Sequence, residues 1–88
     1  MNVNIPRESI EFVETKVTLN GVTITTGVTI AVITEGTRPT VYVTPTTLAG
    51  KIGHLTEVTA TVGIFDVWAK VVSSPETPVV YLGRLTRT

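Results

Sequence analysis

Residues 63–85, GIFDVWAKVVSSPETPVVYLGRL, constrain the fold most, because they have the pattern of two strands joined by a proline-marked turn. Side chains alternate between the two faces of a strand, so Phe65 and the apolar residues at every second position after it point to one face. Trp68 points to the other face, between Asp66 and Lys70. The pattern predicts a sheet that presents its only tryptophan on the less buried side.

Composition supports an all-strand chain with no reactive centre. Threonine and valine supply 33 of the 88 residues and isoleucine another seven, and β-branched side chains fit a pleated sheet better than a helix. Seven basic and seven acidic residues balance, so no net charge attracts nucleic acid or an anionic membrane. With no cysteine and one histidine, the chain is predicted to hold no disulfide, no metal and no cofactor.

We expect an extended N-terminal arm over residues 1–9, followed by a single β domain over residues 10–88. The arm is polar, contains Pro6 and shows no sustained period. A segment that cannot pack alone can add a strand to a neighbour's sheet, so Ile5 and Pro6 are candidate partner contacts. The arm has no secretory pattern, and no segment approaches the roughly 20 apolar residues that span a bilayer, so we expect synthesis in a cytoplasm.

Turn signals divide residues 10–88 into short strands. Residues 10–19 are predicted to form one strand with a bulge near Phe12 or Val13, and Asn20-Gly21 predicts a type I′ hairpin turn after it. Alternation over residues 28–33 predicts a central strand. Residues 46–55 contain two glycines and no clean period, so they predict a long loop with at most one short edge strand.

Three further segments complete the predicted order. Residues 41–43 are expected to place Val41 and Val43 inward around Tyr42. Residues 58–62 form either their own strand or the start of the next one, and residues 73–77 carry turn chemistry before Pro78 opens the last strand.

Six or seven short strands with regular turn signals and no helical period favour an immunoglobulin-like antiparallel β-sandwich, with a small β-barrel as the alternative. The chain has few lysines to guard its strand edges. We therefore expect an edge or a face to be covered in the working state.

The candidate catalytic groups do not form a motif, so we expect no enzyme. The serines lie in arm and turn positions, and His54 is the sole possible general base. GKIG at residues 50–53 lacks the spacing of a phosphate-binding loop. The carboxylates are scattered over strand faces and turns without the linkage that a glycosidase pair requires: Glu11, Glu14, Glu35, Glu57, Asp66 and Glu76.

Trp68 has two interpretations. Either it caps the sandwich or packs under residues 46–55, or it anchors another subunit, because tryptophan, tyrosine and arginine are enriched in interface hot spots. Tyr42 and Arg38 are candidate partner contacts for the same reason. A carbohydrate- or host-surface-binding module using Trp68, Tyr42 and His54 is disfavoured, because sugar sites need amide side chains and the chain has no glutamine and only three asparagines.

Residues 63–85 resemble the C-terminal half of small immunoglobulin-like proteins encoded among the virion genes of tailed bacteriophages, particularly those that infect actinobacteria. EGTRP at residues 35–39 is similar to the loop that follows the central strand in that family. The residues that carry the main resemblance are Gly63, Phe65, Val67, Trp68, Lys70, Pro75, Glu76, Pro78, Val79, Gly83 and Leu85.

This resemblance implies a non-enzymatic protein of the virion. Its most direct form is a decoration or minor capsid protein that binds the major capsid protein, other virion proteins and copies of itself, without nucleic acid, membrane or small-molecule substrate. A head-to-tail connector or a tail-associated protein is the next form. A shell of identical subunits multiplies weak contacts, so a small repeated module can stabilise it.

Overall fold

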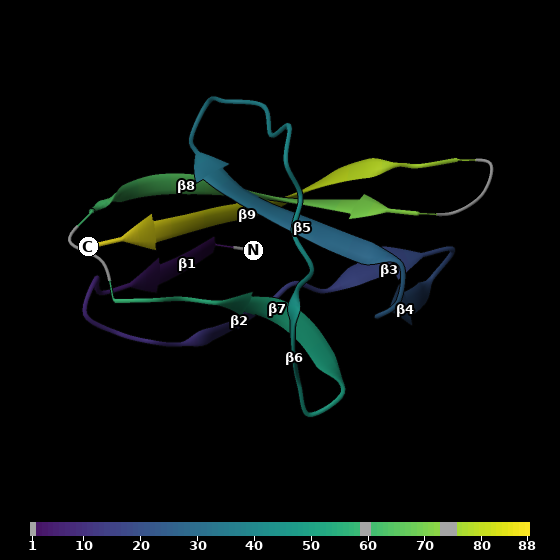
Figure 1. The fold of residues 1–88 in the computed structure, drawn as a ribbon, viewed down its shortest axis with the longest axis horizontal. Helices are drawn as coiled ribbons and strands as arrows, with labels where there is room; N and C mark the ends of the chain where they lie inside the picture. The colour runs from purple at the N-terminus through teal and green to yellow at the C-terminus, as the bar shows by residue number, and fades with distance from the viewer. Residues whose placement is uncertain (1, 59–60, 73–75) are drawn as a thin grey trace.

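The computed structural model describes residues 2–58, 61–72 and 76–88, which form an all-β chain (Figure 1). Within these ranges no helix occurs, so none is present that could cross a bilayer, and the expectation of a strand-built chain is confirmed. The strands are β1 (Asn2–Ile5), β2 (Phe12–Glu14), β3 (Val17–Leu19), β4 (Val22–Ile24), β5 (Val28–Thr34), β6 (Thr46–Leu48), β7 (Lys51–Leu55), β8 (Gly63–Val71) and β9 (Val79–Arg87).

The largest sheet has the strand order β1-β9-β8-β5. β8 pairs antiparallel with both β5 and β9, whereas β1 pairs parallel with β9, with Ile5 opposite Arg87. The expectation that the extended arm adds a strand to a neighbour's sheet is therefore corrected for residues 2–5, which extend the chain's own sheet. The alternation in NVNI buries Ile5 and half-buries Val3 against the core, and this burial holds the segment in place.

A second sheet has the order β2-β7-β6, and β3 and β4 form a separate hairpin. Residues 10–19 are thus not one bulged strand, because the chain leaves the second sheet after Glu14 and enters the hairpin at Val17. Thr15 lies between them, fully buried, and both its N–H and its hydroxyl donate to the carbonyl oxygen of Ile52, at 3.0 and 3.4 Å. Val13, Thr15 and Val17 are all buried, so every second residue here faces the interior. Because threonine is polar, this alternation is not visible in the sequence.

Two hairpins turn on pairs of residues with positive φ. Asn20 and Gly21 have φ of 52° and 78°, which confirms the predicted turn between β3 and β4. Ala49 and Gly50 have φ of 51° and 78° and join β6 to β7, so residues 46–55 form a hairpin and not the predicted loop. Alanine seldom adopts this conformation, and the sequence signal for the second turn is correspondingly weak.

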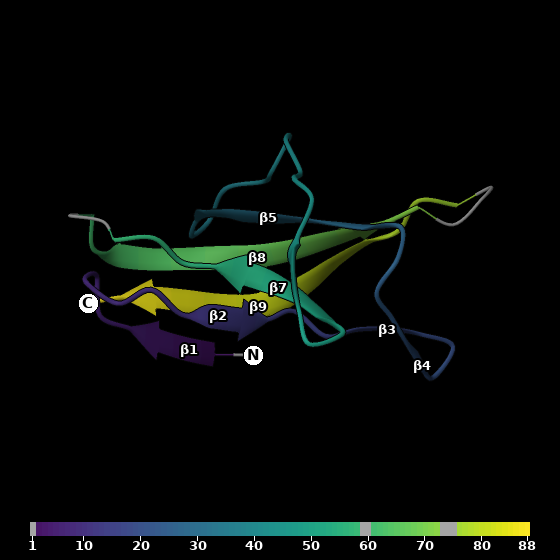
Figure 2. The ribbon, with the colours of Figure 1, turned by 60° about the horizontal axis from the view of Figure 1, so that its bottom comes forward.

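The core lies between the four-stranded sheet and the layer that contains β2 and β7. Figure 2 shows β2 and β7 overlying β9 and β8. One buried cluster joins Ile52 of β7 to the end of the large sheet that carries β5 and β8, and it comprises Val17, Val28, Ile30, Ile52, Ala69 and Val71. The other joins β2 to β1, β8 and β9, and it comprises Ile5, Val13, Val67 and Leu85.

Two expectations near β5 are wrong. β5 is an edge strand of its sheet and not a central one. Val41 and Val43 are 73% and 56% exposed and do not face inward, and Val43 makes only a single bridge to Ile30. The segment after β5 instead crosses from the large sheet toward β6 (Figure 1).

Part of the remaining expectations lies outside the described residues. The possible strand at residues 58–62 includes positions 59–60, and the turn at residues 73–77 includes positions 73–75; neither group is described. Val58 and Val62, which are described, belong to no strand. β8 and β9 confirm the two strands predicted on either side of the turn.

Candidate functional site

β8 positions the candidate site because its successive side chains point to opposite faces of the sheet. Val67, Ala69 and Val71 are buried on the inner face, as the sequence predicts. Trp68 lies on the opposite face and is half-buried. Since one face of the strand fills the core, the identity of the residues on the other face is free to serve a surface role.

Trp68 is covered by neighbours from two different segments. The Tyr81 ring, its cross-strand partner on β9, lies 5.1 Å away centroid to centroid in an edge-to-face arrangement with an interplanar angle of 64°. The guanidinium carbon of Arg38 lies 5.1 Å from the centroid of the indole. The indole is therefore capped by the segment after β5. One of the two predictions had residues 46–55 in this position.

Asp66 ties that segment to the sheet. Its side chain is only 8% exposed, its Oδ2 accepts the backbone N–H of Gly36 at 3.2 Å, and its Oδ1 accepts the hydroxyl of Tyr81 at 3.0 Å. Partial desolvation of the Tyr81 hydroxyl, and then its hydrogen bond to Asp66, raise the pKa of Tyr81 above its ordinary value of 10.0. An ion pair between Glu35 and Arg84, 3.1 Å long, adds a second tie to the same loop.

Sequence reasoning missed this role of Asp66, which looked like one of several scattered carboxylates. The available signal was its alternation with Trp68, which places both residues on the outer face of β8. What the sequence does not specify is the backbone amide of Gly36 that the carboxylate accepts. That contact depends on how residues 35–40 fold back over the sheet.

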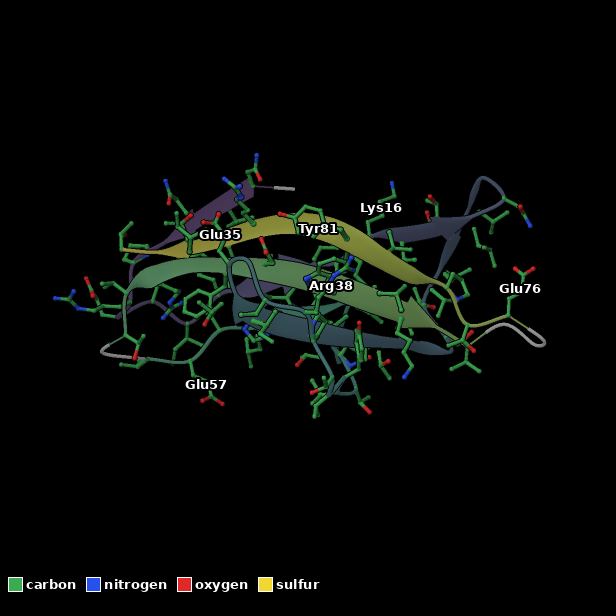
Figure 3. All side chains as sticks on the ribbon, turned by 90° about the horizontal axis from the view of Figure 1, so that it is seen from above. Lys16, Glu35, Arg38, Glu57, Glu76 and Tyr81 are labelled. Carbon is green, nitrogen blue, oxygen red and sulfur yellow. The ribbon has the colours of Figure 1, made fainter. Side chains whose placement is uncertain are left out.

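Tyr42 joins the same surface through Lys70, whose Nζ lies 5.1 Å from the centroid of the Tyr42 ring. Lys70 is on the same face of β8 as Trp68. We call this surface the aromatic–cationic face, and Figure 3 shows Arg38 and Tyr81 above the large sheet. Its members are Arg38, Tyr42, Trp68, Lys70 and Tyr81.

Of the five predicted partner contacts, three are therefore on one surface: Arg38, Tyr42 and Trp68. Ile5 is a correction, because it is 1% exposed and packs in the core with Val13, Val67 and Leu85. A side chain that fills the core is not available to a partner.

Pro6 is exposed, and its carbonyl oxygen accepts the N–H of Ser9 at 3.0 Å in a turn after β1. This turn follows the strand that flanks β9, whereas the aromatic–cationic face is built on β8, β9 and the loop after β5. Pro6 therefore stays a separate candidate contact.

The chemistry that the aromatic–cationic face offers is flat aromatic area with two cationic groups over it. Tyr81 is 46% exposed, so part of that area is open to a partner. Within the described ranges no three His, Asp or Glu side chains gather as metal ligands would. This arrangement suits contact with another protein surface, for which tyrosine, tryptophan and arginine are the preferred anchors.

No protein-family model, curated protein or solved structure matches this chain.

Proposed function

We propose that this chain is a structural protein of a tailed-bacteriophage virion, which binds and stabilises the assembled capsid as a decoration or minor capsid protein and has no enzymatic activity. The observation that carries the proposal is the aromatic–cationic face, where Arg38, Trp68 and Tyr81 stack on one side of the large sheet. The resemblance of residues 35–39 and 63–85 to virion proteins of such phages supplies the identity of the partner. Both resembling segments contribute residues to this face.

The same proposal takes the fold as an immunoglobulin-like β-sandwich. Two buried clusters lie between two layers of strands, and this supports a sandwich. The strand order of the large sheet ends at β1 on one side and at β5 on the other, whereas a barrel requires the ladder to close.

The open edges offer a second way to bind a partner. Neither β1 nor β5 contains a charged residue, although charges are a common device that keeps edge strands apart. Ile30 exchanges both of its backbone hydrogen bonds with Val43, each 2.8 Å long, at the edge of β5 that faces away from β8. Since groups two residues apart point the same way, Val32 also aims its N–H and C=O outward, where the described part of the chain gives them no backbone partner.

A connector or tail-associated protein is the alternative within the virion, since it would use the same surfaces in a ring of a few copies. A sugar-binding module is disfavoured by geometry. His54 lines a cavity with Val32, on the inner side of the sheet, whereas Trp68 lies on the outer side. The three side chains proposed for sugar contact therefore do not share one surface.

The test is to sediment particles of the phage that encodes this chain and to measure its copies per capsid subunit. Hundreds of copies support decoration, and a ring of about six or twelve supports a connector. If purified protein neither sediments with heads nor with tails, the virion proposal is wrong.

A further inference from the structure

Arg87, near the end of β9, is a buried cation whose hydrogen-bonding capacity is only partly used. It is 5% exposed. Its Nη2 donates to the carbonyl oxygens of Glu57 at 2.7 Å and Arg7 at 2.8 Å, with Ser9 further away at 3.5 Å. Its Nε and Nη1 are equally buried, and the described part of the chain provides no hydrogen-bond partner for either.

The charge of Arg87 is also uncompensated. The ion pairs found among the described residues are Arg7 with Glu8 and Arg84 with Glu35, and neither involves Arg87. Three carbonyl oxygens solvate one nitrogen but carry no formal charge. Burial of an ionised group is unfavourable unless it is paired, so both the charge and the two free donors favour an anion.

Arg87 lines a cavity of about 370 Å³ between the inner face of the large sheet and β7. Val32, Phe65 and Leu85 supply apolar wall from the sheet, and His54 and Leu55 supply wall from β7. A second hollow of about 370 Å³ shares Val32 and His54 and continues along the edge of β5. The space is therefore large enough for a small ligand with an apolar body.

Three charged or titratable groups face this cavity. Arg87 is the cation, and Glu57 lines the cavity and has an exposed side chain. Burial and the charge of Arg87 lower the pKa of His54, while the Glu57 carboxylate opposes that shift. At neutral pH the neutral imidazole is therefore favoured, and among the described residues that line the cavity Glu57 is the one carboxylate that repels an anion.

We propose that this cavity binds a carboxylate carried on an apolar group, with Nη1 of Arg87 donating to a carboxylate oxygen and Val32, Phe65 and Leu55 contacting the apolar body. Two sources have this chemistry, a small aliphatic acid and the C-terminal residue of a polypeptide. Nη1 is shielded from solvent, so a wall side chain must move for a ligand to reach it. His54 and Leu55 are the wall residues on β7, where His54 is half-buried and Leu55 is 45% exposed, so they are the candidates to move.

The test uses the wild-type chain and needs no mutation for its main result. His54 is the only histidine, so its ring proton gives one isolated NMR signal. Hexanoate is expected to shift this signal and the methyl signals of Val32 and Leu55 in a saturable way, whereas hexanamide binds at least about tenfold more weakly. Equal shifts from acid and amide, or no saturable shift up to about 10 mM hexanoate, overturn the proposal.

A short peptide that ends in leucine separates the two sources. If the peptide with a free C-terminal carboxylate binds about tenfold more tightly than hexanoate, and its amidated form does not, the natural ligand class is a polypeptide C-terminus. If hexanoate binds more tightly than the peptide, the ligand class is a free acid. Weak binding by both peptide forms and by hexanoate contradicts the carboxylate site itself.

Two substitutions act in opposite directions. Glu57→Gln removes the repelling carboxylate, leaves its backbone carbonyl bonded to Arg87, and is expected to tighten hexanoate binding about two- to fivefold. Glu14→Gln, an exposed change on β2, is the matched control and should have no effect. Arg87→Lys should weaken binding about tenfold or more, and because it can also unfold the chain, its folding is first checked by the dispersion of its NMR spectrum.

Discussion

The guanidinium carbon of Arg38 lies 5.1 Å from the centroid of the Trp68 indole, so a loop residue covers the large aromatic ring that β8 presents on its outer face. Asp66 fixes this arrangement, because it accepts hydrogen bonds from both Gly36 in the loop and Tyr81 on β9. The loop and the two strands thus form one preorganised surface. A surface that is ordered before binding loses less side-chain entropy when a partner arrives.

Replacing Trp68 or Arg38 should weaken particle binding more than it weakens the fold. Trp68→Ala and Arg38→Ala are each expected to reduce co-sedimentation with particles by at least about fivefold, as loss of a hot-spot contact does. The melting temperature should fall by less than about 10 °C for Trp68→Ala, because this side chain is only half-buried. The fall should be smaller for Arg38→Ala than for Trp68→Ala, because Arg38 is exposed. Calorimetry and sedimentation of the same preparations measure the two effects.

Val22→Ala is the matched control, because Val22 is 63% exposed and lies on the separate β3–β4 hairpin. It should change neither quantity. If Trp68→Ala lowers the melting temperature by more than about 10 °C while particle binding is retained, the indole is a core residue and the binding role is wrong.

Gly53→Ala should be strongly destabilising. Gly53 is buried in β7, and a Cβ there would overlap the carbonyl oxygen of Val13 and lie 2.9 Å from Cζ of Phe12. Backbone cannot yield as a flexible side chain does, so we expect a loss of about 2–4 kcal/mol in the free energy of unfolding, measured by urea denaturation.

Gly36→Ala serves as the comparison, because a Cβ at Gly36 meets nothing within 4 Å. That substitution should cost only the strain of a positive φ, about 1–2 kcal/mol. Equal losses for the two glycines would show that the close approach of β7 to β2 is not what Gly53 permits.

Ala49→Asn should stabilise the fold. Ala49 holds φ at 51° in the turn between β6 and β7, a conformation that asparagine adopts more readily. The expected gain is about 0.5–1 kcal/mol, which raises the melting temperature by roughly 2–8 °C in a domain of this size. Ala49→Val is the control and should lower it, because a β-branched residue is strained at positive φ; a loss for Ala49→Asn would contradict the turn geometry.

Stability should depend on pH through His54. Burial and Arg87 lower its folded pKa below the ordinary value of 6.5, so the unfolded chain binds more protons between these two values. The free energy of unfolding is then fully retained above pH 6.5 and falls as the pH drops through the folded pKa. His54→Gln should flatten this part of the curve in urea titrations between about pH 7.5 and 5, and an unchanged slope in that variant would assign the dependence to another group.

Local patterns in the sequence determined the strands and some of their turns. Alternation along residues 64–72 placed Val67 inside and Trp68 outside, and Asn20-Gly21 predicted its hairpin, because both signals depend only on neighbouring residues. The same logic failed at Thr15 and Ala49, where a polar residue is buried and an alanine takes a positive φ.

Only the tertiary structure decided which strands pair and which polar groups are enclosed. The parallel pairing of β1 with β9 buries Ile5, and the cation of Arg87 is enclosed by carbonyl oxygens from residues 7 and 57. Such contacts join residues far apart in the chain, so their free energy depends on burial that forms once the layers close. No periodicity within a strand encodes them, and this is why Asp66 and Arg87 had no recognisable role in the sequence.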